Sequence, residues 1–154
     1  MIFHKIISIC ILTFFIFSCS NDNPGYPSPF SGITHTLEGG PEPVGEVDPN
    51  DWKSIPQVGL VVYPAYPNPT DPFSHLKFTL NQKLFVKVEL DDPVNRKIIT
   101  YDERQLEPGT YQIYIDFNYE PFQRPLDTIV RINIYAEKDG AQYSTYGDIR
   151  VIWK

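Results

Sequence analysis

The sequence predicts an all-β protein, a single immunoglobulin-like antiparallel β-sandwich of about seven strands. Beyond residue 70, apolar residues alternate with polar ones in five segments, turn residues separate these segments, and aromatic residues make up 14% of the chain. Alternation with a period of two is the pattern of half-buried strands, and aromatic residues favour strands. We expect the sandwich over residues 52–154, with almost no helix.

Five sets of alternating apolar residues define the expected strands and their inward faces. These sets are Leu76, Phe78 and Leu80; Leu84, Val86, Val88 and Leu90; Tyr111, Ile113, Ile115 and Phe117; Val130, Ile132 and Ile134; and Ile149, Val151 and Trp153. Between the last two sets, Asp139-Gly140 favours a tight hairpin turn, because both residues tolerate positive φ.

The first nineteen residues have the pattern of an export signal that ends in a cysteine. The apolar run Ile6–Phe17 is shorter than the roughly 20 residues that a membrane-spanning helix needs. Ser18 and Cys19 close this run, and polar residues follow at once. The junction resembles the lipobox of bacterial lipoproteins. The resemblance implies a signal peptide over residues 1–18, a lipidated Cys19 and an outer-membrane location, with the membrane face left open; an ordinary secretory signal is the alternative.

Residues 19–51 are expected to form a largely disordered tether between the lipid and the sandwich. Of the fifteen prolines, eleven lie between Ser20 and Pro72, and glycine and acidic residues accompany them. A segment of this composition buries too little apolar surface to offset the entropy that it loses on ordering.

Three ordered motifs resemble FlgD-like immunoglobulin domains and the related C-terminal sorting domains of type IX secretion cargo. Tyr66-Pro67-Asn68-Pro69 before a strand resembles the YPNP opening of these domains, residues 90–98 resemble their I-Y-D-x-x-G-R-x-V hairpin, and residues 106–113 resemble L-x-x-G-x-Y-x-V. The resemblance covers residues 62–116 and implies the same fold. It also implies a sorting role, which we keep as an alternative, because residues 126–153 depart from the pattern.

The composition and motifs argue against several classes of function. A net charge of −6 offers no electrostatic footprint for nucleic acid. The chain has no recognisable nucleophile, phosphate-binding or metalloprotease motif, so we predict no enzyme. His35 and His75 lack nearby ligands for a transition metal, and no cofactor is expected. Four aspartates leave a calcium site open if their loops gather, with solvated turns as the simpler interpretation. These are Asp71, Asp91, Asp92 and Asp102.

Aromatic residues that face outward or lie in loops are the candidate contact residues. We single out Tyr114, Tyr119, Phe122 and Tyr135. Exposed rings bind sugar rings or protein partners, whereas the alternative is cross-strand pairing that only stabilises the sheet. The predicted function is therefore a lipid-anchored, non-catalytic binding or assembly module, held at the membrane by its lipid, with an envelope protein or a glycan as its partner. A type IX-type sorting domain and a surface adhesin are the alternatives.

Overall fold

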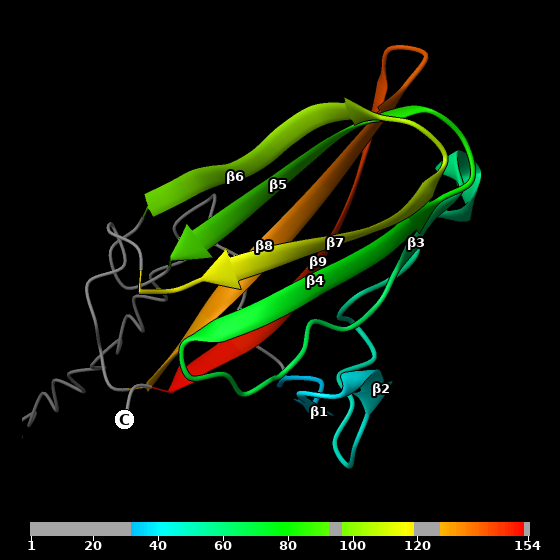
Figure 1. Cartoon of the computed structure of the whole chain (residues 1–154). Coiled ribbons are helices and arrows are strands. Elements are labelled where there is room, and N and C mark those ends of the chain that lie inside the picture. The colour runs from blue at the N-terminus through cyan, green and yellow to red at the C-terminus, as the bar shows by residue number, and fades with distance from the viewer. Residues whose placement is uncertain (1–31, 93–96, 119–126, 153–154) are drawn as a thin grey trace, which may run out of the picture.

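The computed structural model describes residues 32–92, 97–118 and 127–152. Two antiparallel sheets face each other in this part of the chain and form a β-sandwich (Figure 1). One sheet has the order β3–β4–β7, with β3 at Leu60–Val62, β4 at Phe73–Leu80 and β7 at Gly109–Asp116. The other has the order β6–β5–β8–β9, with β6 at Lys97–Leu106, β5 at Leu84–Asp92, β8 at Asp127–Lys138 and β9 at Ala141–Ile152.

The fold class predicted from the sequence is confirmed. Seven strands form the two layers, and the chain crosses between the layers after β4, after β6 and after β7. Crossings of this kind are typical of immunoglobulin-like sandwiches. The only helical element in the described residues is one 3₁₀ turn, η1 (Pro56–Val58), and no helix there is long and apolar enough to cross a bilayer.

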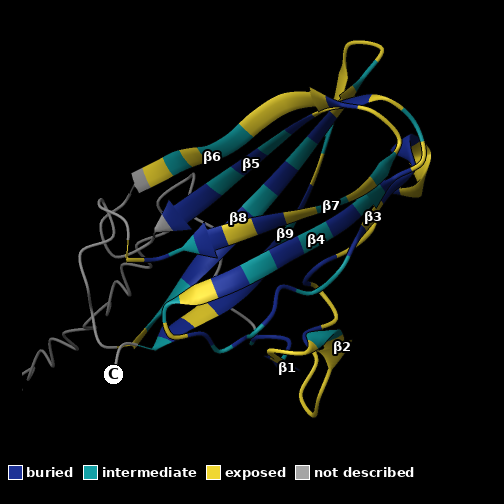
Figure 2. Ribbon diagram, in the orientation of Figure 1, coloured by how far each residue is buried: buried dark blue, intermediate teal, exposed yellow. Residues whose placement is uncertain are grey.

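The core lies between the sheets and includes most of the alternating residues that the sequence indicated, together with Val58, Leu60 and Val62, which the five sets did not contain. Buried and exposed positions alternate along the strands in Figure 2. Leu76, Phe78, Val88, Leu90 and Ile134 are fully buried, which follows from the period of two along each strand. Tyr111 is only partly buried, and Trp153 lies outside the described residues.

The turn between β8 and β9 also forms as predicted. Asp139 and Gly140 both adopt positive φ, at 51° and 77°. Two such residues in succession give the backbone the twist of a two-residue hairpin, and Lys138 pairs with Ala141 across it. This hairpin extends beyond the rest of the sheet at the top of Figure 1.

The expectation of a disordered tether up to residue 51 is corrected for residues 32–51. Two short strands, β1 (Thr36–Leu37) and β2 (Gly40–Pro43), form a hairpin, and Ile33 and Thr36 are buried. The hydroxyl of Thr36 donates to the carbonyl oxygen of Ala65 at 2.7 Å. The composition suggested disorder because this segment buries few apolar side chains; polar contacts with the sandwich order it instead.

Backbone groups of two residues upstream of β4 cover part of the outer edge of β9. Strand β8 pairs with one side of β9, so alternate N–H and C=O groups remain on the other side. The N–H of Trp52 donates to the oxygen of Tyr146 at 2.7 Å, and the N–H of Thr70 donates to the oxygen of Arg150 at 2.9 Å. The oxygen of Thr70 accepts from the N–H of Ile152 at 2.8 Å.

Trp52 closes the core at this edge. The residue is 5% exposed and its φ is 56°, in the left-handed region that non-glycine residues rarely adopt. The indole ring lies directly over Gly147 of β9, where a Cβ atom would approach ring carbons to 2.1–2.4 Å. Glycine at 147 therefore provides the space for the ring.

Candidate functional site

The structure does not bring the predicted contact residues together into one surface. Tyr114 of β7 and Tyr135 of β8 point outward from opposite sheets, because their neighbours Ile113, Ile115 and Ile134 face the core. Tyr119, Phe122 and the predicted lipidation site Cys19 lie outside the described residues.

Tyr135 lies within a pairing interaction of the four-stranded sheet. It is the cross-strand partner of Lys87, whose Nζ lies 5.9 Å from the centre of the tyrosine ring. Burial, followed by the nearby charge of Glu89, raises the pKa of Tyr135. These contacts agree with the simpler interpretation, in which the residue stabilises the sheet.

Tyr114 belongs to a line of rings on the outer face of the three-stranded sheet, which we call the aromatic row: Phe73, Tyr114, His75 and Tyr66. Ring centres are 5.3 Å apart for Phe73 and Tyr114, 5.4 Å for Tyr114 and His75, and 5.3 Å for His75 and Tyr66. The register of the sheet explains this line, since His75 pairs directly with Tyr114 across β4 and β7. Phe73 and Tyr114 are 38% and 50% exposed, so their rings are available for contact.

Two hydrogen bonds orient the histidine of the aromatic row. The hydroxyl of Tyr66 donates to Oε1 of Gln112 at 3.1 Å, and Nε2 of Gln112 lies 3.0 Å from Nδ1 of His75. With the amide of Gln112 assigned in this orientation, its nitrogen donates to Nδ1, and a neutral imidazole then carries its proton on Nε2. In this assignment Nε2 is the donor atom of His75.

A tyrosine from the other sheet supports the aromatic row from β6. Tyr101 lies where the register between β5 and β6 shifts by one residue. Its hydroxyl donates to the oxygen of Tyr114 at 2.8 Å and accepts from the N–H of Asp116 at 3.3 Å. Partial burial and the charge of Asp116 raise the pKa of Tyr114, so the phenol is neutral at physiological pH.

A hollow of about 530 Å³ borders the aromatic row at the start of β4. Its apolar walls come from two prolines, Phe73 and Ile152, and its polar walls come from two carboxylates, a threonine and His75. The lining residues are Glu38, Pro67, Pro69, Thr70, Asp71, Phe73, His75 and Ile152. Glu38 comes from the β1–β2 turn, so the segment expected to be a tether contributes to the hollow. Polar and apolar groups therefore share the walls of the hollow, so a ligand there would need hydrogen-bonding groups as well as apolar faces.

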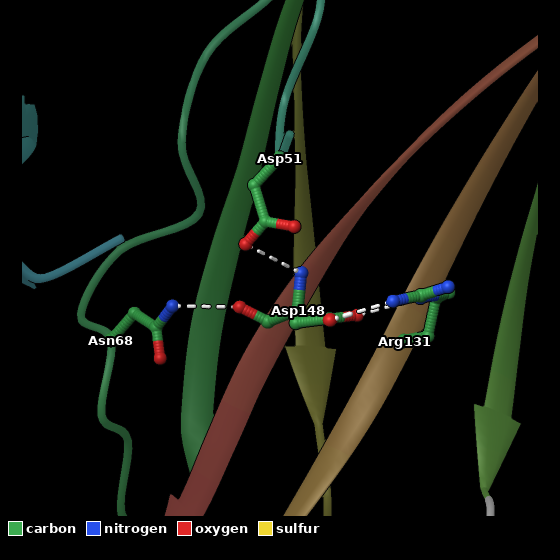
Figure 3. A network of polar contacts seen from close by, with 4 residues as sticks. All are labelled: Asp51, Asn68, Arg131 and Asp148. Carbon is green, nitrogen blue, oxygen red and sulfur yellow. Dashed lines mark hydrogen bonds and ion pairs between the residues drawn. The ribbon is translucent and has the colours of Figure 1, made fainter. Parts of the chain in front are cut away.

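A second group of polar residues is buried at the edge of β9 (Figure 3). Arg131 donates to both carboxylate oxygens of Asp148 at 2.7 and 2.8 Å. Asn68 donates from Nδ2 to the backbone oxygen of Asp148 at 2.8 Å, and its Oδ1 accepts from the N–H of Arg150 at 3.0 Å. Oδ2 of Asp51 accepts from the N–H of Asp148 at 3.2 Å. The side chains of Asp51 and Asn68 thus form hydrogen bonds with the backbone of β9 that a neighbouring strand would otherwise make.

Asp51 has the most strongly shifted pKa in this group. Burial, followed by repulsion from the Asp148 carboxylate, raises the pKa of Asp51 to about 7. Its Oδ1 is buried and has no hydrogen-bond partner among the described residues. Shifted carboxyl groups also occur in active sites, but Asp51 does not line the hollow at the aromatic row. We therefore assign it to the stability of the fold.

The four aspartates considered for calcium do not form one cluster. Asp71 lines the hollow, whereas Asp102 of β6 pairs with Arg104 at 3.0 Å. Asp91 is buried at the end of β5, and the side chain of Asp92 lies outside the described part. In the described ranges, no three His, Cys, Asp or Glu side chains gather as a metal site would require.

The sequence pattern identified Tyr114 of the aromatic row but did not indicate Phe73 or Glu38, which line the hollow beside it. Phe73 precedes the alternating segment, and Glu38 lies in a segment without periodicity. One signal was available: Phe73, His75 and Lys77 alternate with the core residues of β4, so they share an outward face.

No protein-family model matches the sequence, and comparisons with curated proteins and with solved structures also give no match. The aromatic row and the hollow are therefore the features from which function is inferred, since a fold alone does not fix a function.

Proposed function

We propose that the chain is a lipid-anchored, non-catalytic binding module of the outer membrane, which contacts an envelope protein or a glycan. The observation that carries the binding role is the pair of exposed, stacked rings of Phe73 and Tyr114 beside the hollow. Aromatic side chains supply a large contact area at a small entropic cost, because they have only two rotatable bonds.

The anchor is supported by the N-terminal sequence. Cys19 stands where the apolar run ends, as in the lipobox that it resembles. Each buried methylene of an acyl chain contributes about 0.8 kcal/mol to membrane binding, so two or three chains hold a protein at the membrane stably.

The experiment for the anchor is metabolic labelling with a radioactive fatty acid, followed by membrane fractionation. The wild-type protein should be labelled and membrane-bound, whereas Cys19→Ala should be unlabelled and released. Cys10→Ala is the matched control, because Cys10 lies inside the apolar run and should be removed with it. A Cys19→Ala protein that keeps both its label and its membrane location contradicts the proposal.

The sorting domain remains a second candidate because of the three motifs within residues 62–116. A sorting domain of this kind would be recognised by a translocon and processed after secretion. Intact-mass measurement of the mature protein separates the two proposals. A lipidated N-terminus with residue 154 retained supports the binding module, and loss of the C-terminal region supports sorting.

A further inference from the structure

We infer that the hollow at the start of β4 binds an uncharged oligosaccharide, so that the binding module is a glycan-binding one. This inference rests on the proposed function and names the ligand class for the same surface. The hollow, at about 530 Å³, lies within the range of roughly 300–1,000 Å³ found for small-molecule sites.

The apolar walls suit the faces of sugar rings. Pro67, Pro69 and Ile152 form part of the hollow, and Phe73 joins the hollow to Tyr114 of the aromatic row. The face of an aromatic ring carries partial negative charge, and the C–H bonds on the face of a pyranose carry partial positive charge. The exposed ring of Tyr114 lies next to Phe73 but does not line the hollow, so it extends the contact surface beyond the hollow. A longer surface of this kind favours an oligosaccharide over a single sugar.

The charge of the hollow disfavours anionic ligands. Glu38 and Asp71 line it, and among the described residues that form its walls there is no lysine or arginine. Carboxylates accept hydrogen bonds and repel anions, in a chain whose net charge is already −6. Phosphorylated, sulfated and uronic acid ligands are therefore disfavoured, whereas hydroxyl and ammonium groups are suitable donors.

The tautomer assigned to His75 favours hydroxyl groups over ammonium groups on the ligand. Gln112 contacts Nδ1, so Nε2 is the ring nitrogen with which His75, a residue that lines the hollow, would donate to an acceptor on the ligand. Ammonium and guanidinium groups only donate, but a hydroxyl group both donates and accepts. A hollow that offers carboxylate acceptors and an imidazole donor thus matches a polyhydroxylated, uncharged ligand better than a lysine-rich or arginine-rich peptide.

Two side chains of the aromatic row, Tyr66 and His75, are held in place before any ligand arrives. Tyr66 is 9% exposed, and its hydroxyl, Gln112 and His75 form a continuous chain of hydrogen bonds. On the other side, Tyr101 reaches the backbone of Tyr114. Side chains held in this way lose little conformational entropy on binding, which favours affinity for weakly interacting ligands such as sugars.

The test is affinity electrophoresis of the full mature protein, solubilised in detergent, through gels that contain one polysaccharide each. Neutral glucan, mannan and galactan are compared with anionic polygalacturonate and cationic chitosan. We expect at least one neutral polysaccharide to retard the protein, and added NaCl to leave this retardation unchanged, because no ion pair is involved. Phe73→Ala and Tyr114→Ala should each weaken the affinity about tenfold or more.

Phe85→Ala is the matched control. Phe85 is 36% exposed, close to the 38% of Phe73, but it lies on β5 of the opposite sheet. It should bind as the wild type does, and circular dichroism checks that each variant is folded. Retardation by the charged polymers alone, no retardation by any polymer, or equal effects of the Phe73 and Phe85 substitutions would overturn the inference. Fatty-acid labelling of Cys19 is measured in the same preparation. If the label is present but the glycan test fails, the glycan inference is rejected and the proposal of a lipid-anchored module stands.

Discussion

Arg131 and Asp148 face each other across β8 and β9, and both prongs of the guanidinium bind the carboxylate, at 2.7 and 2.8 Å. The Asp148 side chain is almost completely buried, and the Arg131 guanidinium also lies 4.0 Å from the ring centre of Tyr146. The pair stands beside Asp51 and Asn68, which cover the free edge of β9. This arrangement joins the N-terminal segment to the last strand of the sandwich.

Replacing Arg131 with methionine should lower the free energy of unfolding by about 3 kcal/mol or more, because the buried Asp148 carboxylate would lose its counter-charge. Urea denaturation measures this change. Arg150→Met is the control: Arg150 pairs with Asp127 across the same two strands, but both side chains are nearly half exposed. Solvent screening should make its effect small. Equal effects of the two substitutions would contradict the importance assigned to the buried pair.

The pH dependence of stability should carry the signature of Asp51. Its pKa is raised from an ordinary value of 3.8 to about 7 in the folded protein. Between these values the folded state holds a proton that the unfolded state releases, so this group lowers stability as pH rises from 4 to 7. The slope that it contributes is at most about 1.4 kcal/mol per pH unit.

Asp51→Asn isolates this contribution, because the amide keeps the shape of the side chain without titrating. The stability of the variant relative to the wild type should increase as pH rises from 4 to 7 and stay constant above pH 8. Thermal denaturation of both proteins across this range measures the difference. A difference that does not vary with pH would show that Asp51 titrates normally.

Asn68→Ala should remove three hydrogen bonds at once: those that the side chain makes with Thr34, Asp148 and Arg150. We expect a loss of about 2–3 kcal/mol, because the buried backbone groups of β9 would lose their partners. The exposed edge should also favour aggregation. Chemical denaturation and light scattering test both effects, with the exposed Asn50→Ala as control. Unchanged stability would contradict the assigned edge-covering role.

Gly147→Ala should destabilise the protein by about 3 kcal/mol, because its methyl group would collide with the Trp52 ring. The same substitution in a Trp52→Ala background should cost much less. A double-mutant cycle measures this coupling, which should exceed about 1 kcal/mol. If the effects of the two substitutions were additive, the loss of stability caused by Gly147→Ala would not come from contact with the Trp52 ring.

The layers and core of the sandwich could be predicted from the sequence, because their signal is local. Leu76, Phe78, Val88 and Leu90 follow a period of two, and the Asp139-Gly140 turn follows from the tolerance of both residues for positive φ. The order in which distant strands pair has no comparable local pattern in the sequence. Tyr114 and Tyr135 both alternate outward, and only the topology places them on opposite faces.

The ordering of residues 32–51 escaped prediction for a related reason. Asp51 and Asn68 act through side-chain hydrogen bonds with backbone groups of β9, and the bonded residues are 97, 80 and 82 positions apart in the sequence. Polar contacts of this kind leave no period in the sequence. The hollow depends on the same ordering, since Glu38 reaches it from the β1–β2 turn.

The proposed function makes the aromatic row the contact surface of a module held at the envelope. Hydroxyl-radical footprinting compares the oxidation of Phe73 and Tyr114 in intact cells with that in the purified protein, with Phe85 as the internal reference. Strong protection of Phe73 and Tyr114 in cells, with Phe85 unchanged, is the expected result. Equal oxidation of all three residues in both settings would contradict the claim.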